Sequence, residues 1–322
     1  MDSRQSPSLI TRARKILRGG IGVALASTVA LLTLAGCGAT GGGTSSTTGS
    51  NCPSSSAQAS WNLVTPGKLT IITNAPYAPA EYPDPKNPTK IIGYDMDIAA
   101  AIAKQMCLTL VINNTEDFSS IIPSISGPAL GNQLYDMSIS SFTINPQREQ
   151  KVDMIPYFQA GQSLLLPPNS TSGITADIST WCGKSIAVQD GTVELQQIQD
   201  INGGNNGTGE QPVCKSNPIK IQHFADQAIV VLQVVNGSAD ASFQDSPVSG
   251  YYAKLNSGKV VLGPVPNDPN AAVAPEGIVV RKDNPAFETA VKNALATIRA
   301  NGTYMSILTN WGQQSSAYPP LS

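Results

Sequence analysis

Short β-rich runs alternate with segments of helical periodicity along most of this 322-residue chain. Residues 69–73 are typical of a strand, and residues 95–106 place Ile98, Ile102 and Met106 on one face of a helix. Further strands are expected over 108–112, 135–140, 185–189 and 239–243, and further helices over 118–125, 192–198, 225–235, 284–300 and 304–311. Strand–helix alternation predicts an α/β architecture. Ligands of such folds bind on the loops beyond the carboxyl ends of the strands.

Composition narrows the class of protein. Apolar residues make up 41% of the chain, which is enough for packed cores, and the length suggests about two domains. The formal net charge of −2 argues against nucleic-acid binding, which needs a basic surface. His223 is the only histidine, so a His-rich metal site is excluded. We expect neither a cofactor nor an enzymatic activity.

The first 36 residues have the pattern of an export signal. Residues 1–18 carry five basic residues and one acid, and residues 19–36 are uncharged and largely apolar. The sequence Leu34-Ala35-Gly36-Cys37 resembles the lipobox of bacterial lipoproteins, which implies cleavage before Cys37 and lipidation of its thiol. We therefore expect an extracytoplasmic protein anchored to the cell membrane by this lipid, at the cell surface or in the periplasm. A plain transmembrane anchor is the alternative, because the uncharged stretch approaches spanning length.

Residues 37–60 predict a lipidated cysteine followed by a flexible linker, because Gly, Ser and Thr dominate and charged residues are absent. Four cysteines remain beyond Cys37, and an even number outside the cytoplasm suggests disulfides, with three possible connectivities. We favour a bond between Cys182 and Cys214, which lie near turn-rich segments of one region. That choice leaves Cys52 to pair with Cys107. Buried free thiols are the alternative.

Residues 93–103 (GYDMDIAAAIA) resemble the signature of the family 3 extracellular solute-binding proteins, the amino-acid-binding components of bacterial ABC importers. Further segments resemble motifs of this family in the family's order, namely 77–79, 141–148, 188–192, 244–247 and 301–304. Asn145 stands where the family has the second threonine of its Thr-x-Thr-x-x-Arg motif. The resemblance covers about residues 61–313.

This resemblance implies a type II periplasmic-binding-protein-like fold, in which two α/β lobes enclose a cleft. Lobe 1 would comprise residues 61–157 plus 276–313, and lobe 2 with its hinge segments would comprise residues 158–275. Residues 314–322 would form a C-terminal tail. The implied protein is a monomer that delivers a free amino acid to an ABC permease and ATPase. The alternatives are a sensory binding protein and a cyclohexadienyl-dehydratase-like enzyme, which the single histidine and the absence of an obvious acid pair disfavour.

The charges of a free amino acid indicate what such a cleft must offer. Arg148 presents a planar fork of donors suited to the α-carboxylate, and Asp245 an anion suited to the α-ammonium. The ligand set implied by the resemblance is Asn74, Tyr77, Phe118, Ser141, Thr143, Arg148, Gln189, Thr192 and Asp245. The alternatives are a core position for the two aromatic residues, a helix N-cap for Thr192 and an ordinary turn for Asp245.

Side-chain specificity depends on two positions of the implied pocket, Asn74 and Gln189. Both are uncharged amides, which suit a polar neutral side chain such as that of glutamine. The alternative is that both amides only bond the protein backbone. A cationic ligand would need an acid, for which Glu81 and Asp95 lie nearby in the sequence. We therefore expect a polar, uncharged amino acid as the ligand.

Overall fold

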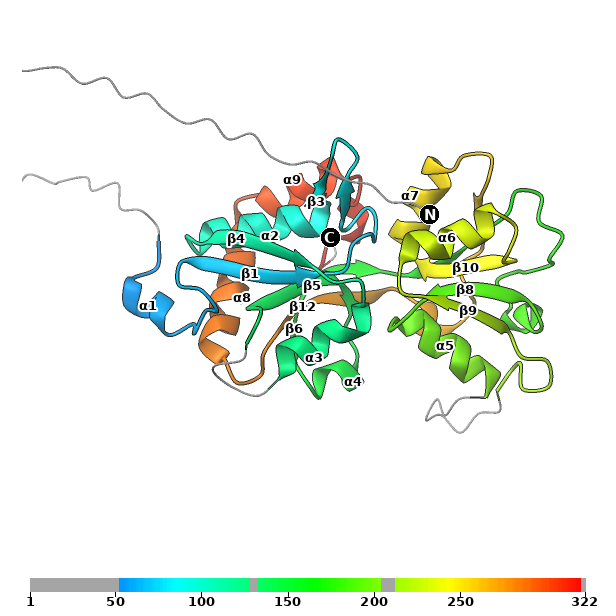
Figure 1. Cartoon of the computed structure of the whole chain (residues 1–322), viewed down its shortest axis with the longest axis horizontal. Helices are drawn as coiled ribbons and strands as arrows, with labels where there is room; N and C mark the ends of the chain where they lie inside the picture. Colours follow the sequence, from blue (N-terminus) through cyan, green and yellow to red (C-terminus); the bar gives the residue numbers. More distant parts are fainter. Residues whose placement is uncertain (1–51, 128–132, 204–211, 320–322) are drawn as a thin grey trace, which may run out of the picture. The chain divides into compact units, whose positions relative to one another are not determined.

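The computed structural model describes residues 52–127, 133–203 and 212–319. Within them the longer strands form two five-stranded sheets, with the orders β4-β1-β5-β12-β6 and β11-β7-β10-β8-β9 (Figure 1). The first sheet contains β1 (Lys68–Thr73), β4 (Thr109–Asn114), β5 (Met137–Thr143), β6 (Asp153–Ala160) and β12 (Ala274–Val280). The second contains β7 (Gln162–Leu166), β8 (Ser185–Gln189), β9 (Lys220–Phe224), β10 (Ala241–Asp245) and β11 (Val261–Leu262).

Lobe 1 is built on the first sheet. In Figure 1, α2 (Tyr94–Gln105) and α3 (Ile121–Ser126) cover opposite faces of this sheet. The helices α8 (Pro285–Ala300) and α9 (Thr303–Asn310) pack against α2. The start of α2 requires glycine, because a Cβ on Gly93 would lie 1.9 Å from the carbonyl oxygen of Ala80. Remaining elements of this lobe are β2 (Tyr82–Asp84), β3 (Asn87–Ile92), the 3₁₀ turn η1 (Phe118–Ser120) and α4 (Pro146–Glu149).

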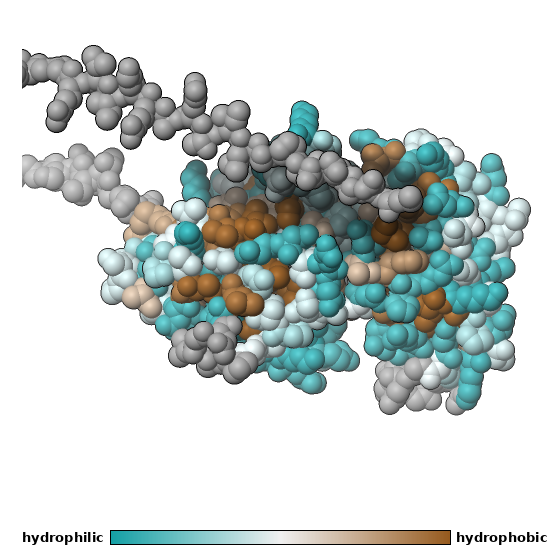
Figure 2. Space-filling view, viewed as in Figure 1, coloured by the Kyte–Doolittle hydropathy of each residue, from teal (hydrophilic) through white to brown (hydrophobic). Residues whose placement is uncertain are grey.

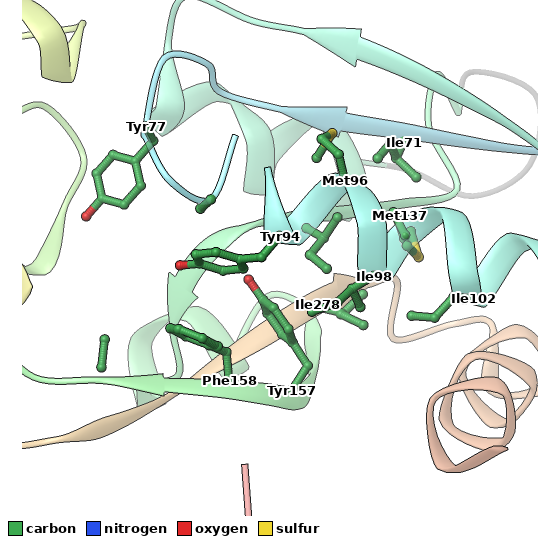
Figure 3. Close-up of a cluster of buried hydrophobic side chains, with 14 of the residues drawn as sticks. Ile71, Tyr77, Tyr94, Met96, Ile98, Ile102, Met137, Tyr157, Phe158 and Ile278 are labelled. Atoms are coloured by element: carbon green, nitrogen blue, oxygen red, sulfur yellow. The ribbon is translucent and has the colours of Figure 1, made fainter. Parts of the chain in front are cut away.

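The core of lobe 1 joins α2 to the sheet. Figure 3 shows Tyr94 of α2 beside Tyr157 and Phe158 of β6. The Tyr94 and Phe158 rings stack with their centroids 4.6 Å apart. Ile98 and Ile102 are fully buried on the same helix, as their four-residue spacing predicts. This packing holds the N-terminus of α2 next to the carboxyl ends of β1 and β5, where the Ser141 N–H donates to Asp95.

Lobe 2 is built on the second sheet. Figure 1 places α5 (Val193–Asn202) on one face and α6 (Gln227–Val235) on the other, with α7 (Ser246–Leu255) directly after β10. Trp181 is fully buried, and its ring meets that of Phe243 edge-on at 5.4 Å. The short turns η2 (Ile178–Trp181) and η3 (Pro269–Ala271) complete this lobe.

The chain passes between the two sheets twice. The first crossing is at Gly161, between β6 and β7, and the second lies between β11 and β12. Lobe 1 is therefore discontinuous in sequence, as the resemblance implies. The α/β class and the two-lobe fold are confirmed, and the predicted strands and helices are present within a few residues of their expected bounds.

Two expected irregular segments are instead packed on lobe 1. In the predicted linker, residues Ser55–Ala59 form α1, Cys52 is bonded to Cys107, and the Gln58 side-chain amide donates to the Met106 carbonyl at 3.1 Å. In the predicted tail, Gln314–Ser316 form the turn η4. Ala317, just beyond it, is buried and forms a β-bridge with Phe158. Both corrections have one cause, because each segment has a specific contact with the lobe that composition alone does not reveal.

Both expected disulfides are present, Cys52 with Cys107 and Cys182 with Cys214. Hydrophilic residues cover much of the face shown in Figure 2, with hydrophobic residues in smaller groups between them. In the described ranges, no helix has the length and apolarity needed to cross a bilayer. The predicted signal peptide, the lipidation of Cys37 and the linker up to residue 51 lie outside those ranges.

Candidate functional site

A cavity lies where loops of lobe 1 meet loops of lobe 2. All nine residues of the implied ligand set line it. Four further residues complete the lining, namely Glu81, Ser140, Val193 and Glu194. The contributing loops follow β1, β5, β8 and β10 at their carboxyl ends, where α/β folds place ligands.

Arg148 enters the cavity from α4. Asn145 caps this helix, because its side-chain oxygen accepts from the Arg148 backbone N–H at 2.9 Å. The guanidinium donates to the Thr143 carbonyl at 2.7 Å and, across the cleft, to the Gly191 carbonyl at 3.2 Å. Burial lowers the pKa of Arg148 to about 10, so the group remains a cation at neutral pH.

Two aromatic rings lie beside this guanidinium. The Phe118 and Phe142 rings stack at 4.2 Å, and the Arg148 carbon Cζ lies 5.7 Å from the first centroid and 5.0 Å from the second. Cation–π attraction therefore helps to hold the fork in place. Phe118 is both a cavity residue and part of a buried cluster, so its expected alternatives are not exclusive.

Tyr77 and Asp245 join the lobes at the opposite wall. The Tyr77 hydroxyl donates to the Asp245 carboxylate at 2.6 Å, and Figure 3 shows the Tyr77 ring projecting away from the lobe 1 core. Asp245 is the residue before α7, but its side chain makes no capping hydrogen bond to the N–H groups of that helix. The carboxylate is therefore available to the cavity, which it lines. Burial, and next the charge of Glu194, raise the pKa of Asp245 well above its usual range.

The two amides that were expected to recognise the ligand side chain form a hydrogen bond to each other across the cleft. The Gln189 amide nitrogen donates to the Asn74 side-chain oxygen at 2.7 Å and to the Ala225 carbonyl at 3.0 Å. The Asn74 amide nitrogen donates to the Thr115 carbonyl at 2.7 Å. One of these three bonds joins the lobes, and the other two hold each amide to the backbone of its own lobe.

Thr192 and Ser141 each support a helix as well as lining the cavity. The Thr192 hydroxyl accepts from the Leu195 N–H at 3.3 Å, so Thr192 is the N-cap of α5. Ser141 has a left-handed backbone with φ of 45°, and its N–H donates to Asp95 of α2 at 3.0 Å. Next to Thr192, Gly191 permits close approach of the lobes, since a Cβ there would lie 3.0 Å from Ser119.

Two carboxyl groups in the lining were not in the expected ligand set. Glu81 accepts from the Ser140 hydroxyl at 2.5 Å, and Glu194 from the Gln162 amide at 2.9 Å. Burial raises the pKa of both carboxyls. The sequence held a signal for each, because Glu81 lies four residues after Tyr77 and Glu194 two residues after Thr192. Among the lining residues, three carboxyls now face a single guanidinium.

Two α/β lobes that enclose a cleft, with a guanidinium from one and a carboxylate from the other, define the class of two-lobe binding proteins. The chain belongs to the bacterial extracellular solute-binding proteins, family 3, whose sequence model matches residues 69–314.

Named relatives of this chain are binding proteins. It is 29% identical to the ABC transporter arginine-binding protein 1 of Escherichia coli (strain K12), over 77% of this chain and 91% of that protein. It is 25% identical to the ABC transporter glutamine-binding protein GlnH of Bacillus subtilis (strain 168), over 72% and 77% respectively. The solved structure of an ancestral arginine-binding protein bound to arginine superposes with a TM-score of 0.65 at 28% identity, covering 76% of this chain and 98% of that one.

Proposed function

We propose that this protein is the receptor of an amino-acid ABC importer and that its ligand has a cationic side chain, as arginine does. The observation that carries the proposal is the charge of the cavity lining, in which Glu81, Glu194 and Asp245 accompany Arg148. The ligand named for the E. coli relative and for the ancestral structure supports the same class.

The charges can be matched group by group. Arg148 pairs with the ligand carboxylate and Asp245 with its ammonium, which leaves Glu81 and Glu194 to the side chain. A buried carboxylate without an opposite charge is costly, and a cation nearby favours its ionised form. An uncharged side chain would leave both carboxyls without that compensation. The carboxyls therefore support a cationic ligand over the uncharged one expected from Asn74 and Gln189.

Closure couples binding to transport. Among the residues that the structure describes, three hydrogen bonds cross the cleft, from Tyr77 to Asp245, from Gln189 to Asn74 and from Arg148 to Gly191. A ligand that contacts both lobes adds to these bonds and shifts the population toward the closed form. The permease and ATPase would recognise that form. The two disulfides suit an oxidising compartment outside the cytoplasm, and lipid on Cys37 would anchor the monomeric receptor there.

Calorimetric titration tests the ligand class. L-Arginine and L-citrulline have nearly the same shape, but citrulline has no side-chain charge. We expect arginine to bind at least about tenfold more tightly than citrulline, glutamine or glutamate, because one well-placed charge pair is worth ~1.4 kcal/mol or more. Equal affinity for arginine and citrulline would contradict a ligand with a cationic side chain. If no amino acid binds, the proposed receptor function is wrong. Turnover of prephenate would instead support the enzyme alternative.

A further inference from the structure

Glu276 is a buried acid beside the cavity for which the proposed ligand contacts have no use. It lies in β12, just after the second crossing between the lobes. Its side chain is 1% exposed, and neither carboxyl oxygen has a hydrogen-bond partner among the described residues. A buried ionised carboxylate in that position would lose its hydration without compensation.

The register of β12 directs this side chain toward the ligand site. Glu276 lies opposite Thr143 of β5 in an antiparallel pair. Directly opposed residues of such a pair have their side chains on the same face of the sheet. Thr143 lines the cavity, so Glu276 lies directly behind the lining.

Several ionisable groups interact electrostatically with Glu276. Asp245 and Asp95 have the largest effects after burial, and together with burial they raise the pKa of Glu276 well above its usual range. The other groups that interact with it electrostatically are Glu81, Glu194, Tyr77, Tyr94, Tyr157, Tyr304 and the Arg148 guanidinium. These effects favour the neutral form of Glu276 while the cavity is empty.

The other cavity acids differ from Glu276 in one respect. Ser140, Gln162 and Tyr77 donate hydrogen bonds to Glu81, Glu194 and Asp245 respectively. Such donors favour the ionised form of a carboxyl group. No described side chain makes a hydrogen bond of ordinary geometry to Glu276, and the Ser141 hydroxyl nearby lowers its pKa less than burial, Asp245 and Asp95 raise it. Its ionisation therefore depends most strongly on a positive charge brought in by a ligand.

We propose that Glu276 is a specificity-determining residue that transfers its proton to solvent when a cationic side chain enters the cavity. The O–H bond of Glu276 breaks, the buffer takes the proton, and the carboxylate left behind attracts the cation. An uncharged side chain provides nothing to stabilise that carboxylate, so the proton stays. This inference rests on the proposed binding of a cationic amino acid.

The test is calorimetric titration of the full-length protein with arginine at pH 7 in phosphate and in Tris. These buffers differ in ionisation enthalpy, so the difference in binding heat gives the protons released. For the wild type we expect more protons to be released per arginine than per citrulline. Glu276→Gln should release fewer protons and bind arginine about tenfold more weakly, with citrulline affinity unchanged. The control is Glu288→Gln, which removes a carboxylate paired with Lys292 on the surface of α8.

Equal proton release and an equal arginine-to-citrulline ratio in the wild type and Glu276→Gln would overturn the inference, while arginine binding itself would stand. Glu276→Met, of similar volume and without polar atoms, replaces the amide variant if that one does not fold. If the wild type fails to bind arginine, the proposed ligand class is at fault. Stability of the ligand-free protein then still tests Glu276, since its removal should lessen the loss of stability as pH rises above about 5. An unchanged pH profile would refute a neutral Glu276.

Discussion

The hydrogen bond from Tyr77 to Asp245 gives a direct measure of how much lobe closure contributes to affinity. Tyr77→Phe removes only the hydroxyl oxygen and keeps the ring at the cavity wall. The bond is 2.6 Å long and buried, and its acceptor is the Asp245 carboxyl group, which the proposed ligand ammonium would keep ionised. Hydrogen bonds to charged groups contribute about 1.5–3 kcal/mol. Because this bond exists only when the lobes are closed, its loss should weaken arginine binding by about 10- to 150-fold.

Calorimetry and small-angle X-ray scattering together test this reasoning. The affinity should fall, and at subsaturating arginine the radius of gyration should indicate more of the open form. The matched control is Tyr135→Phe, a tyrosine of lobe 1 that does not line the cavity. Binding by Tyr77→Phe within about twofold of the wild type would show that this contact does not hold the lobes together.

Three further predictions concern the site and the fold. Arg148→Lys should weaken amino-acid binding at least about tenfold in calorimetry, because an ammonium cannot bond Thr143, Gly191 and a carboxylate in one plane; unchanged affinity would remove Arg148 from the site. Replacing Cys52 and Cys107 by serine should lower the free energy of unfolding in urea by about 4 kcal/mol, because the disulfide closes a loop of 55 residues in the unfolded chain. An unchanged urea midpoint would show that the disulfide does not stabilise the protein by restricting the unfolded chain. Burial raises the pKa of Asp95 to about 7 from a usual value of 3.8, so the folded state holds a proton that the unfolded chain has lost, and stability should fall as pH rises from about 4 to about 7. In urea titrations across this pH range, Asp95→Asn should make the free energy of unfolding depend less on pH. A stronger dependence in the variant would contradict a raised pKa for Asp95.

The strands and helices could be predicted because they depend on local sequence, and the residues of the cavity because continuous motifs resemble those of the family. Residues 95–106 repeat their apolar side chains every four positions, and α2 buries that face. The motif around Arg148 is likewise a continuous segment, and its first turn follows β5 directly. Such features need only neighbours in the chain.

The properties of the cavity that depend on distant pairs could not be predicted in this way. Asn74 and Gln189 are 115 residues apart, and only the fold shows that they bond each other. Glu276 is opposite Thr143 only through the register of an antiparallel pair. The packed segment around α1 was missed because one disulfide and one side-chain bond from Gln58 hold a sequence whose composition is that of a linker.

The points at which the N-terminal segment is attached determine which lobe takes up a pulling force applied to that segment. Cys52 is bonded to Cys107 at the end of α2, and the Asn284 amide donates to the Trp61 carbonyl at 2.7 Å. A pulling force on the chain before Cys52 is therefore transmitted to lobe 1, through the disulfide and the hydrogen bond to Trp61. The two crossings are the covalent connections of lobe 2 to lobe 1, so once the hydrogen bonds across the cleft are broken, lobe 2 can move while the pulled end of the protein stays still.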